Sequence, residues 1–167
     1  KTKIGIMYYL WEDSGNGINV IFMGNNRKSY LDYLEKLKDK NKSLGQLTFN
    51  EKKSGRIEAA IGNYLDGNVR KINLKPKFIT GTEFEKKVLS RLISIPYGKT
   101  ISYKKLAVLI GHPDACRAIG SALRKNPVML AVPCHRVIRS DGSIGKFSGG
   151  GESIKKFLLA LEQSVEK

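Results

Sequence analysis

Cys134, His135 and Arg136 stand next to one another, between a proline and a β-branched valine. Cysteine is the strongest nucleophile among the side chains at neutral pH, provided that its thiol can lose a proton. A neighbouring histidine is a base that can take this proton. The alternative is a buried structural cysteine at the end of a strand, because free cysteine is among the most buried residue types. Three polarisable or charged side chains in a row make a poor core, so we favour a nucleophilic site.

The chain holds two cysteines, Cys116 and Cys134, and no CxxC spacing. One disulfide at most could form, and free thiols in a reducing compartment are the simpler interpretation. No apolar run approaches the roughly 20 residues that span a bilayer, and no signal-peptide pattern opens the chain. The sequence therefore predicts a cytoplasmic protein without a membrane partner, or a nuclear one if the source is eukaryotic.

The net charge is strongly positive, with 30 Lys and Arg against 15 Asp and Glu. Residues 99–146 alone carry nine basic and two acidic side chains, and they include the cysteine. This excess indicates a polyanionic partner, either nucleic acid or an anionic membrane surface. The alternative is an ordinary Lys-rich protein, because many of the lysines are spaced singly as on solvated helices.

The first half of the chain has the pattern of a small α/β domain over residues 1–76. Residues 4–10 and 18–23 are β-prone and flank a turn cluster containing Asn-Gly, which predicts a hairpin. Apolar stripes predict helices over 29–38 and 57–65, with a polar loop over 39–54 between them. Residues 69–74 are expected to form a short strand. No catalytic constellation is visible here, and residues 77–81 are expected to connect to a second domain over 82–167.

The second half opens with three predicted helices. Thr82 and Glu85 form a capping box, and Ser102 is the predicted N-cap of the next helix. A break at 111–113 separates that helix from a third, which Asn126-Pro127 ends. Two short amphipathic helices joined by a glycine-containing turn are typical of a helix-turn-helix. The second of them presents a polar, basic face made of Arg117, Ser121 and Arg124.

Beyond the cysteine, residues 137–139 and 143–147 flank a turn and are expected to pair as a hairpin, or wing. Ser148 to Gly151 form a flexible loop whose backbone N–H groups can approach a ligand. The last helix is expected from about Ser153. Lys155 and Glu162 lie on one stripe of it, so both could face the same site.

Several motifs stand in the order seen in one protein family. They are Gly81-Thr82-Glu83-Phe84, Ile95-Pro96-Tyr97-Gly98-Lys99-Thr100, Ser102-Tyr103, Arg117-Ala118-Ile119-Gly120, Asn126-Pro127, Pro133-Cys134-His135-Arg136-Val137 and Ser148-Gly149-Gly150. Over residues 81–162 the chain thus resembles the O6-alkylguanine-DNA alkyltransferases, also called methylated-DNA–protein-cysteine methyltransferases. The resemblance implies an α/β (α+β) fold: an RNase H-like N-terminal domain followed by a winged helix-turn-helix domain that holds the site.

The resemblance also implies a reaction, the direct reversal of DNA damage. Cys134 would take an alkyl group from O6 of guanine, and less readily from O4 of thymine. Transfer would be irreversible and stoichiometric, so each molecule would act once, without a cofactor. Some relatives bind zinc through Cys and His of the N-terminal domain. Residues 1–80 contain neither residue type, so we expect no metal.

Five residues resemble the catalytic groups of the family. His135 would accept the proton of Cys134 through a water, and Glu162 would orient the histidine ring. Tyr103 would donate towards guanine N3 as charge develops there. Asn126 would be the hinge that holds the loop of the site. Arg136 is interpreted as a structural anchor for that loop.

A second set would surround the alkylated base. Lys155 resembles a lysine near the sulfur, and the backbone N–H of Ser148 resembles the group that meets O6. Phe147 stands where many relatives have tyrosine, so the range of accepted alkyl groups could differ. The substrate-binding set is Val137, Phe147, Ser148, Gly149 and Lys155.

The expected partner is double-stranded DNA, bound by a monomer through the minor groove with little sequence preference. The lesion lies inside the duplex, so the base must be extruded into the pocket. Arg117 resembles the arginine that fills the vacated stack, and Leu123 resembles an apolar wedge. The DNA-binding set is Ser102, Lys104, Arg117, Ser121, Leu123 and Arg124.

Three other functions remain open at this stage. An alkyltransferase-like protein binds the lesion without catalysis, but such proteins usually have tryptophan in place of the cysteine. A winged-helix regulator would bind a specific operator, with Cys134 buried or redox-active. A cysteine hydrolase would turn over many times.

Overall fold

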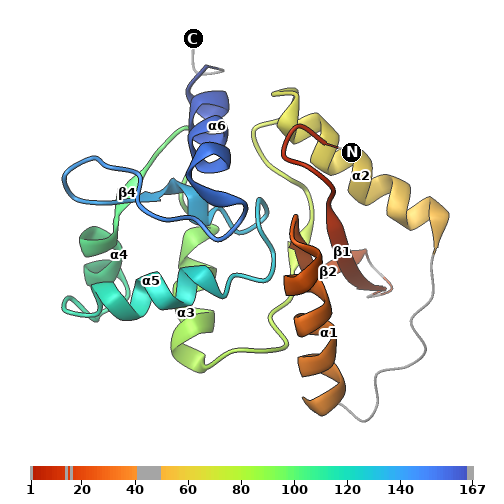
Figure 1. Cartoon of the computed structure of the whole chain (residues 1–167), viewed down its shortest axis with the longest axis horizontal. Helices are drawn as coiled ribbons and strands as arrows, with labels where there is room; N and C mark the ends of the chain where they lie inside the picture. Colours follow the sequence, from red (N-terminus) through yellow and green to blue (C-terminus); the bar gives the residue numbers. More distant parts are fainter. Residues whose placement is uncertain (1, 14, 16, 41–49, 165–167) are drawn as a thin grey trace.

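The protein is described by a computed structural model over residues 2–13, 15, 17–40 and 50–164. Two parts lie side by side in Figure 1, which we call the N-terminal part (2–76) and the C-terminal part (82–164). The N-terminal part contains a sheet and two helices, and the C-terminal part is mainly helical.

A hairpin forms the centre of the N-terminal part. Strands β1 (Tyr8–Asp13) and β2 (Ile18–Gly24) pair antiparallel, and β3 (Lys75–Pro76) adds parallel to β2. The predicted hairpin is confirmed, although its first strand begins at Tyr8 rather than at residue 4. The strand predicted over residues 69–74 is wrong. That segment is irregular and buries Ile72 in the core, so its apolar residues reflect packing and not sheet pairing.

Helices α1 (Arg27–Lys40) and α2 (Glu51–Leu65) enclose the buried strand β2. Helix α1 packs on Ile21 and Phe22, whereas α2 belongs to the main core with Val20. Both predicted helices are present but longer than expected. The predicted loop 39–54 is shorter at both ends. Helix α1 extends to Lys40, and Asn50 accepts a hydrogen bond from the Lys53 N–H at 3.0 Å and caps α2. Residues 41–49 of that loop lie outside the described residues.

Three helices begin the C-terminal part. Helix α3 (Glu83–Leu92) starts at the predicted capping box, in which the Thr82 and Glu85 side chains bind each other's backbone N–H. Helix α4 (Tyr103–Leu109) is capped by Ser102, and α5 (Cys116–Arg124) follows after a turn. Helices α4 and α5 pack together as the predicted helix-turn-helix, and α3 packs against α5. Gly111 occupies the left-handed region at φ 76°, which favours glycine in this turn.

The predicted wing hairpin is wrong. Strand β5 (Val137–Ile138) pairs in parallel with β4 (Ile101–Ser102), and residues 143–147 form no strand. Gly142 and Gly145 both have positive φ angles, which turn the chain away from an extended path. The chain continues into α6 (Gly151–Ser164), which begins two residues before the predicted start at Ser153.

The two parts share one hydrophobic core. Buried residues of the N-terminal part, such as Val20 and Ile61, belong to the same cluster as Leu92 and Leu158. The Met23 N–H donates to the Pro127 carbonyl and the Met129 N–H donates to the Met23 carbonyl, both at 2.8 Å. Strand β2 is thereby fixed to the segment that leads into Cys134.

Two searches of the described residues bear on possible partners. None of the helices in that part of the chain is both long and apolar enough to cross a bilayer. Over the same residues, His, Cys, Asp and Glu side chains do not gather in threes where they could hold a metal ion.

Candidate active site

Cys134 begins a single 3-10 turn, η1 (Cys134–Arg136). The Arg136 N–H closes the turn on the Pro133 carbonyl at 3.1 Å. Successive side chains in such a turn point about 120° apart, so Cys134 and His135 face different directions. All three side chains of the turn are buried.

Asn126 holds the chain in front of the cysteine, as the resemblance implies. Its side-chain Nδ2 donates to the Val132 carbonyl at 2.9 Å, and its Oδ1 accepts from the Val128 N–H at 3.1 Å. Nδ2 also lies 3.1 Å from the sulfur of Cys134. Nothing in the sequence pattern indicates this last contact. Asn126 therefore both fixes the loop and donates a hydrogen bond to the nucleophile.

Leu130 shapes the same loop. It is buried and has a φ of 70°, the left-handed region that a branched side chain rarely adopts. The Val132 N–H then returns to the Val128 carbonyl at 3.0 Å. Such a backbone conformation costs on the order of 1–3 kcal/mol and persists only where its surroundings enforce it. Here the enforcing contacts come from Asn126 and from β2.

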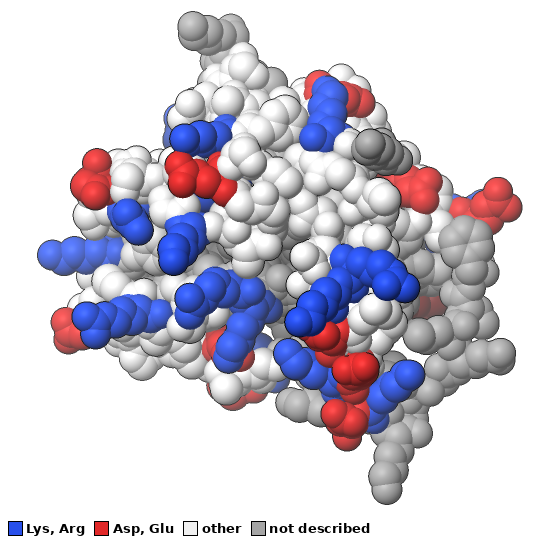
Figure 2. Space-filling view, viewed as in Figure 1, with Lys and Arg blue, Asp and Glu red and all other residues white. Residues whose placement is uncertain are grey.

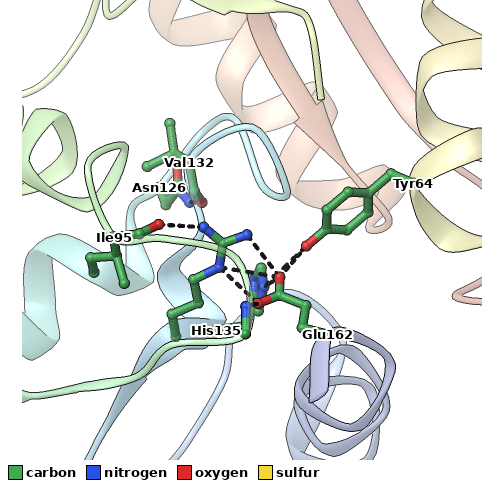
Figure 3. A network of polar contacts seen from close by, with 8 residues as sticks. Tyr64, Ile95, Asn126, Val132, His135 and Glu162 are labelled. Atoms are coloured by element: carbon green, nitrogen blue, oxygen red, sulfur yellow. Dashed lines mark hydrogen bonds and ion pairs between the residues drawn. The ribbon is translucent and has the colours of Figure 1, made fainter. Parts of the chain in front are cut away.

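Glu162 of α6 lies at the centre of a buried polar network (Figure 3). Its Oε1 lies 2.7 Å from His135 Nε2, and Arg136 donates to both carboxylate oxygens from Nε and Nη2 at 2.9–3.1 Å. Oε2 accepts from the Gly98 N–H at 3.0 Å, and Arg136 Nη1 donates to the Ile95 carbonyl at 2.5 Å. Arg136 thus has the anchoring position predicted for it.

The hydroxyl of Tyr64 is a further donor to Glu162 Oε1. Tyr64 belongs to α2 in the N-terminal part and points across to α6 in Figure 3. Burial would raise the pKa of Glu162, but the hydrogen bonds from His135, Arg136 and Tyr64 outweigh it and lower this pKa to about 2. The carboxylate is therefore charged at neutral pH.

A charged Glu162 fixes the tautomer of His135. Nε2 must carry the hydrogen that faces the carboxylate, which leaves Nδ1 as an acceptor. Among the described residues, Nδ1 is buried and has no hydrogen-bond partner. Burial lowers the pKa of His135 although Glu162 acts in the opposite direction. His135 is therefore a neutral imidazole with one ring nitrogen free to accept a proton.

The resting cysteine is a neutral thiol. Burial raises the pKa of Cys134, and the Asn126 hydrogen bond and the charge of Lys155 only partly oppose this. Lys155 is itself buried and donates to the Val137 carbonyl at 2.6 Å. Burial lowers the pKa of Lys155 to about 8, against the pull of a Cys134 thiolate. A nucleophilic thiolate must therefore be produced by proton transfer during the reaction.

Cys134 borders a cavity of about 530 Å³ between the two parts of the chain. This volume falls in the roughly 300–1,000 Å³ range of small-molecule sites. Ser148 and Gly149 line it from the loop before α6. The remaining lining comes from β2 and α1, from α3 and the residues before it, and from the segment between the end of α5 and Cys134. The surface is hollowed between α5 and α1 in Figure 2. Asn25 ties the loop to the N-terminal part through a 3.3 Å bond from Nδ2 to the Gly149 carbonyl.

Comparison with known proteins leads to one family. Residues 83–164 match the 6-O-methylguanine DNA methyltransferase DNA-binding domain. The methylated-DNA–protein-cysteine methyltransferase of Methanosarcina barkeri is 40% identical over 151 residues, which cover 88% of this chain and 92% of that protein. The chain belongs to the methylated-DNA–protein-cysteine methyltransferase family.

Other members of this methyltransferase family match different shares of the chain. The mouse protein is 52% identical over 80 residues, or 47% of this chain, and the chain spans only 38% of the mouse protein's length. The structure of Mycobacterium tuberculosis OGT in complex with DNA superposes with a TM-score of 0.73 at 29% identity, covering 94% of this chain and 87% of that one. The mixed α/β fold of these methyltransferases therefore extends over both parts.

Several residues expected around the substrate interact with Cys134 or share its cavity: Ser148 and Gly149 line the cavity, and Lys155 and Tyr103 interact with the charge of a Cys134 thiolate. Tyr103 begins α4 and is half-buried; burial raises its pKa, and a Cys134 thiolate would raise it further. Val137 is buried and Ser148 is exposed at the rim. A Cβ atom at Gly149 would lie 2.7 Å from ring carbons of Phe147, so a larger residue there would have to displace the Phe147 ring. Of the expected catalytic and substrate-binding residues, Asn126, Cys134, Ser148 and Gly149 line the cavity. The roles of these residues remain predictions.

Most of the expected DNA-binding set lies on α4 and α5. Lys104, Arg117 and Arg124 are exposed, and Ser102 and Ser121 are half-buried. Figure 2 shows Lys and Arg side chains in a band over α4 and α5 that continues to α1. Leu123 is an exception, because it is 6% exposed and packs in the core, so it is not a surface wedge.

Sequence reasoning missed three groups that contact the site. Tyr64 was part of the apolar stripe of a predicted helix, Gly98 belonged to a family motif without an assigned role, and Asn25 carried no signal. Tyr64 and Gly98 bind Glu162, and Asn25 binds the Gly149 carbonyl. Partners 64 to 124 residues apart in sequence cannot be paired by local pattern.

Proposed function

We propose that this protein repairs DNA by moving an alkyl group from O6 of guanine to Cys134, once per molecule. The observation that carries the proposal is the buried thiol of Cys134, held by Asn126 beside a neutral His135 whose Nδ1 has no partner in the described part of the chain. O4 of thymine is a second, slower substrate. Family membership supports this activity, since the relatives are named for methyl transfer from DNA to a protein cysteine.

The reaction begins when the sulfur of Cys134 attacks the alkyl carbon bonded to guanine O6. A sulfur–carbon bond forms while the carbon–oxygen bond breaks, and the guanine leaves with the electron pair. The thiol proton passes through a bridging water to Nδ1 of His135, and Glu162 stabilises the imidazolium. Because burial disfavours a resting thiolate, this proton transfer must accompany the attack.

Two further residues balance charge on the reacting groups. The ammonium of Lys155 stabilises negative charge on the sulfur as it develops. The hydroxyl of Tyr103 donates towards N3 of the departing guanine, which would otherwise leave as a bare anion. The product is a thioether on Cys134, and the mechanism gives none of the described side chains a role in cleaving it. Transfer is therefore stoichiometric.

The DNA partner is a duplex bound through the helix-turn-helix. The exposed cations of α4 and α5 suit phosphate contacts, and a relative of similar fold has a structure in complex with DNA. We propose docking in the minor groove, with the alkylated base extruded into the cavity and Arg117 filling its place in the stack. The small residues Ala118 and Gly120 on α5 allow close approach.

The finer description of the fold is also a proposal. Residues 1–76 would correspond to an RNase H-like domain and 82–167 to the helix-turn-helix domain of the family, with an irregular segment in place of the wing hairpin, joined by 77–81. The protein would act as a monomer, because one chain supplies all the groups in the mechanism. Its free thiol suits the reducing cytoplasm, or a nucleus in a eukaryote.

Intact-mass measurement tests the proposal directly. The protein is incubated with a duplex that contains one O6-methylguanine, and we expect a single methyl gained on the Cys134 peptide. Cys134→Ser should gain none, whereas Cys116→Ser should react like the wild type. Tight lesion binding without any mass change would favour the non-catalytic role, and more than one equivalent of repaired DNA would indicate a hydrolase.

A further inference from the structure

Tyr64 brings the N-terminal part into contact with the proton relay. Its side chain is 1% exposed, and its hydroxyl donates to Oε1 of Glu162. The same hydroxyl lies 3.4 Å from Nε2 of His135. In Figure 3 the ring of Tyr64 extends from α2 towards Glu162 on α6. This residue lies outside the segment 83–164 that matches the family's DNA-binding domain.

We propose that Tyr64 is a positioning residue for alkyl transfer: it binds the Glu162 oxygen used by His135 and so keeps His135 neutral and able to accept the proton of Cys134. The proposal rests on the proposed function and adds to it a role for the N-terminal part.

Several hydrogen bonds share one oxygen of Glu162. Oε1 of Glu162 faces His135 Nε2, two nitrogens of Arg136 and the Tyr64 hydroxyl. Each donor takes part of the negative charge that would otherwise draw a proton onto the histidine. Removing the hydroxyl leaves more of that charge for His135, which then becomes protonated at higher pH.

Protonation of His135 before the reaction would stop the relay. An imidazolium carries hydrogens on both ring nitrogens, so Nδ1 could no longer accept the proton of the thiol. His135 must therefore be neutral when the substrate arrives and charged only during transfer. A carboxylate whose charge is shared among several donors meets both conditions.

The other ionisable groups around the relay do not replace Tyr64. Arg136 and Lys155 are cations whose charges both lower the pKa of His135, and Cys134 is the proton donor. Tyr97 packs edge-on against Tyr64 with ring centroids 5.9 Å apart, but its buried hydroxyl has no partner among the described residues. Burial and the Glu162 charge raise the pKa of Tyr64 strongly, so its hydroxyl keeps its proton and remains a donor.

Tyr64→Phe tests the proposal, with Tyr97→Phe as the matched control. Single-turnover transfer from free O6-benzylguanine is measured between pH 5 and pH 9, which avoids any effect on DNA binding. We expect the acid limb of Tyr64→Phe to move up by about half a pH unit. Transfer at the low-pH end then falls about threefold, while the rate above pH 8 stays within about twofold of wild type.

The outcomes separate the two proposals. If the wild type transfers no alkyl group, the proposed function fails before Tyr64 is considered. If the wild type reacts and the two pH profiles superimpose, or Tyr64→Phe loses the same factor at every pH, the role of Tyr64 is overturned. Tyr97→Phe should keep the wild-type profile, and thermal unfolding of both variants reports any loss of folding separately.

Discussion

At the scale of single residues, the site pairs the Cys134 thiol, which is difficult to deprotonate, with the His135 imidazole, which burial keeps neutral. Burial raises the pKa of Cys134 and lowers that of His135. Both shifts favour uncharged partners at rest, so the charge separation is confined to the reaction itself. Glu162 supplies the fixed negative charge that makes this separation possible, and Arg136 keeps Glu162 ionised in a buried position.

Glu162→Gln is expected to be costly for both folding and transfer. The amide would leave the buried guanidinium of Arg136 without its counter-charge, which typically costs about 3–5 kcal/mol of unfolding free energy. The wild-type pKa of about 2 lies below the roughly 4.3 of an unfolded glutamate. The ionised carboxylate therefore stabilises the fold above about pH 4.3, and this contribution is lost as the pH falls towards 2.

Urea unfolding at several pH values measures this effect. Wild type should exceed Glu162→Gln by several kcal/mol at pH 7, and the difference should shrink between about pH 4 and pH 2. The exposed Glu83→Gln serves as control and should change the unfolding free energy by less than about 0.5 kcal/mol. Equal stability of Glu162→Gln and wild type at pH 7 would contradict the account of the network.

At the scale of elements, local signals predicted local structure. The capping box at Thr82, the cap at Ser102 and the stop after Arg124 each depend on residues a few positions apart, and all three are present. Where the pairing partner is distant, prediction failed. The strand next to β5 is β4, 36 residues earlier in the register Ile101–Val137, and not the nearby segment expected to form a wing.

Helix α5 is present as predicted, but one of its residues, Leu123, was assigned to the wrong environment. Arg117 and Arg124 lie on its exposed face, whereas Leu123 packs into the hydrophobic core. The apolar stripe of α5 predicts this burial. The family resemblance assigned Leu123 to DNA instead, and the structure corrects that assignment.

Arg117→Ala is expected to separate base extrusion from chemistry. Arg117 is exposed on α5 and lies outside the relay, so transfer from free O6-benzylguanine should stay within about twofold of wild type. Repair of O6-methylguanine in a duplex should fall at least tenfold, because an extruded base costs a few kcal/mol that the arginine helps to offset. Arg91→Ala, at the exposed end of α3, is the control. An equal loss on both substrates would remove the extrusion role.

At the scale of the whole molecule, the N-terminal part supports the active site through hydrogen bonds to three of its segments. Met23 binds the segment before Cys134, Asn25 binds the loop at Gly149, and Tyr64 binds Glu162. These contacts join residues that are far apart in the chain, so the sequence predicted the reactive residues and not their support. The motifs of the C-terminal part located the nucleophile, its base and its hinge, because these lie within ten residues of one another.

The charge of the whole molecule is predicted to govern its affinity for DNA. With a net charge of +15 and a cationic band over α4 and α5, binding should release counterions from the phosphates. The logarithm of the association constant should then fall linearly with the logarithm of salt concentration. About six phosphate contacts would give a loss of roughly 10³ in affinity between 50 and 200 mM salt. Undamaged duplexes of different sequence should behave alike.

Fluorescence anisotropy with a labelled duplex measures this slope, and Arg124→Ala should reduce it by about one phosphate contact. Lys71→Ala, an exposed cation in the segment before β3, is the comparison and should leave the slope unchanged. Transfer from free O6-benzylguanine should hardly depend on salt, because no phosphate is bound. Strong salt dependence of this second reaction would place the effect in the active site instead of on the DNA-binding surface.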